Sequence, residues 1–143
     1  MTHFFRILVA ALAAALLTAP VASAQSAFAP TLSAPSNGKS LARGKAFTFK
    51  AKLDSASSAS GVFVRVAKSK KVDAEGLISD DLYMRSMTLR GGTYQHKTER
   101  YPALSSHFLN KPGKYYWQAY AIDCSDGTDD CNIESEIRSF RIK

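Results

Sequence analysis

The sequence predicts an all-β protein made of two antiparallel sheets packed face to face, and three observations support this fold class. Several short segments alternate apolar with polar residues, which is the pattern of strands that bury one face. Turn-forming pairs such as Asn37-Gly38 and Pro112-Gly113 separate these segments. No segment beyond residue 24 carries a long apolar stripe with the 3.6-residue period of a helix. Short strands separated by turns are typical of an antiparallel sandwich.

The alternation is clearest in three segments, residues 46–53, 61–69 and 114–122. We expect the apolar residues on one face of each segment to form the core. These residues are Phe47, Phe49, Ala51 and Leu53 in the first, Val62, Val64 and Val66 in the second, and Tyr115, Trp117, Ala119 and Ala121 in the third. Residues 82–89, 92–101 and 136–143 alternate less regularly and complete the expected strands.

The first 24 residues have the features of a secretory signal peptide. Arg6 precedes an apolar run over residues 7–17, and Ala22-Ser23-Ala24 forms an A-x-A cleavage motif before Gln25. The run is 11 residues long, whereas a helix that spans a bilayer needs roughly 20. We therefore expect residues 1–24 to be removed. The rest of the chain would be secreted, extracellular or periplasmic, without stable insertion into a membrane.

The remaining chain is expected to contain one domain. Residues 25–36 are rich in Ser, Ala and Pro, and they are predicted to form an extended leader into the first strand. Residues 37–143 would form the domain itself, a length that suits a single hydrophobic core.

The C-terminal part of the chain resembles the last two strands of a fibronectin type III domain, which is an immunoglobulin-like sandwich. Pro112-Gly113 is followed by Tyr115 and by small or apolar residues at every second position, and Ser135 to Ile142 has the Ser-Glu-aliphatic-x-Ser-Phe-x-aliphatic pattern. The resemblance implies that Tyr115 is a tyrosine-corner residue whose hydroxyl binds nearby backbone. It also implies that Phe47 or Phe49 takes the place of the usual second-strand tryptophan.

The two cysteines of the chain, Cys124 and Cys131, enclose an acidic loop. In the sandwich they flank the last hairpin, where paired strands bring Cα atoms to about 4.5–5.5 Å, and an exported chain meets an oxidising compartment. We expect one disulfide. A calcium site remains an alternative, although the spacing differs from an EF-hand loop; its candidate ligands are Asp123, Asp126, Asp129, Asp130 and Glu134. A redox site is disfavoured because no Cys-x-x-Cys motif occurs.

A second candidate contact surface lies on the strand that contains Tyr115. Tyr116, Gln118 and Tyr120 fall on the face opposite Tyr115 and Trp117. In a sandwich this face is expected to meet solvent, so the two tyrosines beside Gln118 would form a strip for sugar rings or a protein partner. The alternative is that these rings pack on neighbouring side chains such as Arg65.

Other chemistry has little support in the sequence. His96 and His107 have no further cysteine or histidine at zinc-ligand spacing, and no G-x-S-x-G motif occurs, so we expect no catalytic residue, metal or cofactor. The basic run Lys68 to Lys71, near Arg65, lacks interleaved aromatic residues, so no nucleic-acid partner is expected.

The sequence therefore predicts a non-catalytic, exported binding module. The formal net charge is +7, which favours anionic partners such as cell-wall polymers. The expected ligand is a cell-envelope or extracellular glycan or protein. The alternative is a protein-binding or inhibitory module that uses its loops, above all residues 124–131. A small enzyme is the third hypothesis, and it predicts a pocket lined by His96, His107 or acids with shifted pKa values.

Overall fold

A computed structural model describes residues 28–55, 57–99, 109–125, 127 and 131–143. These residues form strands in two sheets, and no helix among them is long and apolar enough to cross a membrane. The strands are β1 (Thr31–Ala34), β2 (Lys39–Leu41), β3 (Thr48–Lys52), β4 (Gly61–Ala67), β5 (Tyr83–Ser86), β6 (Thr88–Arg90), β7 (Thr93–Lys97), β8 (Gly113–Ile122), β9 (Asn132–Glu134) and β10 (Arg138–Ile142).

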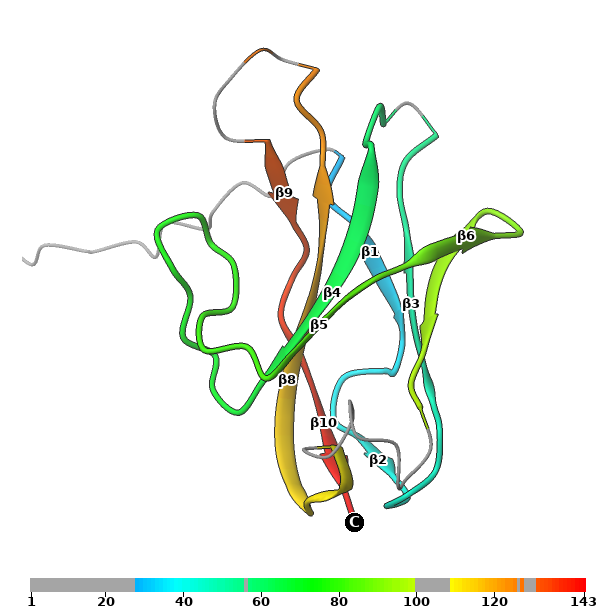
Figure 1. Cartoon of the computed structure of the whole chain (residues 1–143), viewed down its shortest axis with the longest axis vertical. Helices are drawn as coiled ribbons and strands as arrows, with labels where there is room; N and C mark the ends of the chain where they lie inside the picture. The colour runs from blue at the N-terminus through cyan, green and yellow to red at the C-terminus, as the bar shows by residue number, and fades with distance from the viewer. Residues whose placement is uncertain (1–27, 56, 100–108, 126, 128–130) are drawn as a thin grey trace, which may run out of the picture.

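The two sheets confirm the predicted sandwich (Figure 1). The smaller sheet has the order β1-β3-β7-β6. The larger sheet has the order β2-β10-β8-β4-β5, and β9 pairs with the C-terminal end of β8. The described strand pairs are antiparallel except for β2 and β10, which are parallel. After β1, the chain crosses from the smaller sheet to the larger one, where β2 runs in the same direction as β10.

The chain crosses between the sheets at both sides of the sandwich. On one side β1 pairs with β3, and after a turn β2 pairs with β10. On the other side β5 pairs with β4, and β6, which starts two residues later, pairs with β7. Met87 lies at this second crossing and is buried in the core. The predicted strand 82–89 is therefore two short strands in different sheets (Figure 1).

The sandwich begins earlier than the sequence indicated. Residues 31–34 lie within the predicted leader, yet they form β1 and pair with residues 50–52 of β3. Leu32 is buried in the core, whereas Thr31 and Ser33 are exposed. The Ser/Ala/Pro-rich composition hid this strand, because a short edge strand needs only one inward apolar side chain.

The core contains most of the residues that the alternation placed inside, although Phe47 and Leu53 are only partly buried, together with others such as Leu32 and Met87. Phe49, Val64, Trp117 and Phe140 are buried in one cluster that joins both sheets. The centroids of the Phe49 and Trp117 rings are 5.0 Å apart, so Phe49 packs where the resemblance expected an aromatic residue from the second strand. The close contact of large rings at an angle is a favourable aromatic arrangement.

Tyr115 makes the contact expected of a tyrosine corner. Its ring is buried and stacks on Phe140, with centroids 5.4 Å apart. Its hydroxyl donates a hydrogen bond of 2.6 Å to the backbone carbonyl of Lys111, four residues upstream. This bond ties the start of β8 to the turn before it.

Candidate functional site

The disulfide predicted between the two cysteines is confirmed. Cys124 and Cys131 are bonded, and their Cα atoms are 4.5 Å apart. The backbone amide of Asp123 donates to the carbonyl of Cys131 at 2.8 Å, so the bond lies directly beyond the β8–β9 ladder. Three of the five candidate calcium ligands lie outside the described residues; they are Asp126, Asp129 and Asp130, which are also the candidate contact residues of this loop. Among the described residues no cluster of three or more potential metal ligands occurs.

Asp123 joins two loops at the same end of the sandwich. Its carboxylate accepts hydrogen bonds from the Ser58 hydroxyl at 2.9 Å, the Ser58 amide at 3.1 Å and the Ser57 hydroxyl at 3.4 Å, all from the β3–β4 loop. The same carboxylate accepts a bond of 3.1 Å from the Ser125 amide in the β8–β9 loop. Figure 1 shows both loops at the upper end of the molecule. We call this region, residues 54, 55 and 57–60 with residues 123–125, 127 and 131, the loop end.

The hydrogen bonds to Asp123 also set its acidity. Bonds from Ser125 and Ser58 stabilise the charged carboxylate and lower its pKa from 3.8 to about 2, although burial opposes the shift. The carboxylate thus holds Ser57 and Ser58 of the β3–β4 loop in place. The signal available in the sequence was an aspartate directly after a strand and beside a cysteine, but only the fold brings it to the serines.

The expected exposed strip on β8 is wrong. Gln118 is 1 % exposed and Tyr120 is 6 % exposed, and only Tyr116 is partly exposed. The sequence argument assumed that the outer face of this sheet meets water. In the structure, the chain between β4 and β5 folds back over that face. We call this segment, residues 68–82, the covering loop.

Gln118 fastens the covering loop to the sheet. Its side-chain oxygen accepts a hydrogen bond of 2.9 Å from the Ile78 amide. Its side-chain nitrogen donates to the carbonyls of Gly76 at 3.0 Å and Ser135 at 3.1 Å. The side chains of Leu77 and Ile78, which belong to the loop, are buried. Gln118 therefore has a structural role, because all three bonds satisfy buried polar groups.

The two tyrosines of the strip have packing partners, as the alternative had anticipated. Tyr120 stacks on Phe63 with ring centroids 5.3 Å apart, and the Arg65 guanidinium lies 5.2 Å from its ring centroid. Tyr116 has the ammonium groups of Lys70 and Lys114 at 5.7 Å and 5.1 Å from its ring centroid. These contacts leave no continuous aromatic surface on β8.

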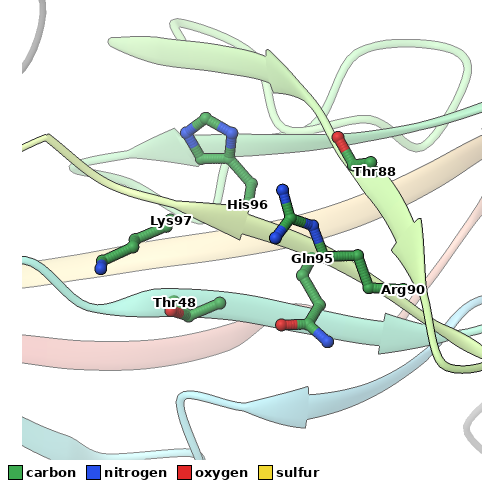
Figure 2. A pocket seen from close by; sticks show the side chains of 6 residues that line it. All are labelled: Thr48, Thr88, Arg90, Gln95, His96 and Lys97. Carbon is green, nitrogen blue, oxygen red and sulfur yellow. The ribbon is translucent and has the colours of Figure 1, made fainter.

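A polar hollow lies on the smaller sheet, on the face turned away from the core (Figure 2). Its volume is about 340 Å³. Side chains from β3, β6 and β7 line it, and they carry two positive charges and no negative charge. The lining residues are Thr48, Thr88, Arg90, Gln95, His96 and Lys97.

His96 borders this hollow, as the enzyme hypothesis required, but its imidazole is used within the fold. The Tyr83 hydroxyl and His96 Nε2 are 2.6 Å apart, and Figure 2 shows the ring on the opposite side of β7 from Gln95. Burial lowers the pKa of His96, while a bond to the Ser86 backbone opposes the shift. Burial also raises the pKa of Tyr83 to about 12. Both shifts favour a neutral pair. His107 lies outside the described residues.

Similarity to known proteins is found among solved structures. No family model matches the chain, and no curated protein matches it in sequence. Among solved structures it is similar to the fibronectin(III)-like modules of CbhA from Clostridium thermocellum, with 20% identity over 80% of this chain and 45% of that chain, and a TM-score of 0.49. The assignment of the fold as a two-sheet β-sandwich rests on the strand pairing of the chain itself.

A second solved structure is more distant. An AA10 lytic polysaccharide monooxygenase from Streptomyces lividans is 11% identical over 74% of this chain and 58% of that chain, with a TM-score of 0.38. This chain thus spans about half the length of each of these two solved structures.

Proposed function

We propose that the protein is an exported, non-catalytic binding module that contacts a protein partner through its loop end. The observation that carries this proposal is the Asp123 carboxylate, which holds the β3–β4 and β8–β9 loops against each other with hydrogen bonds from both. In immunoglobulin-like sandwiches, loops gathered at one end of the sheets are common contact surfaces.

Three described residues of the loop end are fixed by one carboxylate. Asp123 fixes Ser57 and Ser58 on one loop and Ser125 on the other, and the Cys124–Cys131 disulfide closes the second loop. A surface that is already ordered loses less conformational entropy on binding, so more of its contact energy appears as affinity. The acidic residues Asp126, Asp129 and Asp130 are proposed as contacts within this loop, where they would favour a basic patch on the partner.

Export is part of the proposal. Disulfides persist in oxidising compartments and are rare in the cytosol, so the Cys124–Cys131 bond supports it. The charged residue, apolar run and A-x-A motif of the first 24 residues support it independently. Export is checked by expressing the full chain and measuring the intact mass of the protein recovered outside the cytoplasm. A chain that begins at Gln25 is expected, and a full-length chain retained in the cytoplasm would refute export.

The proposed contact is tested by affinity capture from the envelope and medium proteins of the producing organism. We expect one partner to be enriched at least tenfold by the oxidised protein. That enrichment should fall in Asp123→Asn, which keeps the shape of the side chain but removes the charge that holds the loops. It should also fall in the double variant Cys124→Ser/Cys131→Ser.

The matched control for this experiment is Asp73→Asn. Asp73 is an exposed aspartate of the covering loop, and its carboxylate accepts hydrogen bonds from two amides of that loop and forms a 3.7 Å ion pair with Arg65 of β4. The control variant should retain the partner. Equal enrichment by the Asp123 variant and the oxidised protein, or loss in the Asp73 variant alone, would refute the loop end as the contact surface.

A further inference from the structure

The face of the smaller sheet that is turned away from the core has a one-sided charge. The strands β1, β3, β6 and β7 contain no aspartate or glutamate, but they carry four permanent positive charges. Alternation places all four on the outer face, because Phe49, Ala51 and Tyr94 occupy the inner positions of β3 and β7. The four cations are Lys50, Lys52, Arg90 and Lys97. We call this surface the basic face.

The strand register brings the cations of different strands together. Thr48 pairs with Lys97 between β3 and β7, and Arg90 pairs with Thr93 between β6 and β7. Neighbouring strands are about 4.8 Å apart, and alternate residues of one strand are about 7 Å apart. The four cations therefore share one face of neighbouring strands, and Figure 2 shows two of them, Arg90 and Lys97, at the border of the hollow.

None of the four cations forms an ion pair within the part of the chain that the structure describes. The ion pairs found there join Arg65 to Asp73 and Arg138 to Glu136, and neither pair belongs to the basic face. Four like charges on one small surface repel one another, so the patch attracts an anion with several charges.

The neutral residues between the cations indicate what kind of anion fits. They are hydroxyl and amide side chains that can donate and accept hydrogen bonds. The outer positions of the four strands hold no aromatic residue on which a nucleic-acid base could stack. A sheet face that carries cations and hydroxyl groups on neighbouring strands suits an extended polymer that carries both anionic groups and many hydroxyls. The neutral residues are Thr31, Ser33, Thr48, Thr88, Thr93 and Gln95.

We propose that the basic face binds an acidic polysaccharide, which lies across β3, β7 and β6. Arg90 and Lys97 contact its carboxylate or sulfate groups at the hollow, and Gln95 and Thr48 bind its hydroxyls. This surface is separate from the loop end and goes beyond the proposed function. A module with both surfaces would attach to an anionic polymer outside the cell while its loops remain accessible to a protein partner.

The test measures the binding of purified residues 25–143 to polygalacturonate, which carries carboxylates, and to dextran sulfate, which carries sulfate esters. Dextran is the neutral control polymer and duplex DNA is the control polyanion. At about 0.1 M NaCl we expect binding to at least one acidic polysaccharide, weaker binding to DNA and none to dextran. Binding should weaken as the salt concentration rises, because exposed charges are screened.

Variants then locate the site. Arg90→Gln/Lys97→Gln should weaken polysaccharide binding about tenfold or more. The matched control is Lys114→Gln/Arg141→Gln, which removes the same charge from β8 and β10 of the other sheet and should change binding less than threefold. Lys50→Gln/Lys52→Gln provides a second pair on the basic face. Thermal unfolding of each variant establishes that it is folded, and NMR shift changes in the unaltered protein provide the same localisation without substitution.

Three results would overturn the proposal. The first is equal weakening by the basic-face and control pairs, which would mean that net charge alone governs binding. The second is DNA binding as tight as polysaccharide binding. The third is the absence of binding to either acidic polymer. None of these results affects the loop end, which is tested with Asp123→Asn.

Discussion

The covering loop depends on one buried side chain, and replacing Gln118 by methionine tests this directly. Methionine has a similar length and volume but makes none of the three hydrogen bonds to Ile78, Gly76 and Ser135. A typical hydrogen bond contributes about 0.5–1.5 kcal/mol net, and a buried polar group left without a partner costs more. The covering loop can open to let water reach its backbone, which limits the loss. We expect the free energy of unfolding to fall by about 2–3 kcal/mol.

Two measurements check this prediction. Urea denaturation gives the change in the free energy of unfolding. Native-state hydrogen exchange reports on the Ile78 amide, which loses its acceptor in the variant. The matched control is Gln95→Met, the same substitution on the outer face of β7, where we expect a change within about 0.5 kcal/mol.

The two outcomes differ clearly. If Gln118 holds the loop, Gln118→Met loses more stability than Gln95→Met, and the Ile78 amide exchanges faster. If the two variants lose the same stability and Ile78 keeps its protection, the covering loop is held by the burial of Leu77 and Ile78 alone, and the reasoning from hydrogen bonds is refuted.

Three further predictions concern the disulfide and two titrating groups. The variant Cys124→Ser/Cys131→Ser should lose about 2–3 kcal/mol of unfolding free energy in urea, since the disulfide closes a short loop; an unchanged midpoint would contradict this. The folded-state pKa of Asp123 lies below its usual value, so its contribution is complete above pH 4 and is lost as the pH falls toward 2. Asp123→Asn should flatten the stability profile in that range, and a parallel profile would count against the carboxylate. Burial likewise lowers the pKa of His96, so its contribution is complete above pH 6.5 and decreases as the pH falls below it. His96→Gln should remove this decrease in thermal unfolding temperature, whereas an unaltered pH dependence would show that another group titrates.

Local patterns in the sequence were sufficient to predict the sandwich and its disulfide. The inward positions Phe49, Val64 and Trp117 follow from alternation, because successive strand residues point to opposite faces. The disulfide follows from two cysteines beside one hairpin. The turn before β8 and the hydroxyl of Tyr115 follow a motif that is local in the chain. Each of these features depends on residues that are close in sequence.

Features that depend on distant segments were decided by the tertiary structure. Gln118 and Tyr120 sit at outward positions, and no local pattern shows that residues 68–82 fold over them. The leader assignment failed for the same reason, since β1 is defined by its pairing with β3 rather than by its own composition.

The candidate sites divide in the same way. The sequence identified the cysteine-closed loop, but the hydrogen bonds from Ser57 and Ser58 to Asp123 join residues more than 60 positions apart. The basic face likewise combines strands whose order in the sheet is not their order in the chain. Alternation and turn chemistry act over a few residues, so the sequence by itself determined which side chains each strand buries. Sheet order and loop docking depend on contacts between remote segments, so only the folded chain decided which polar groups meet and which surfaces remain exposed.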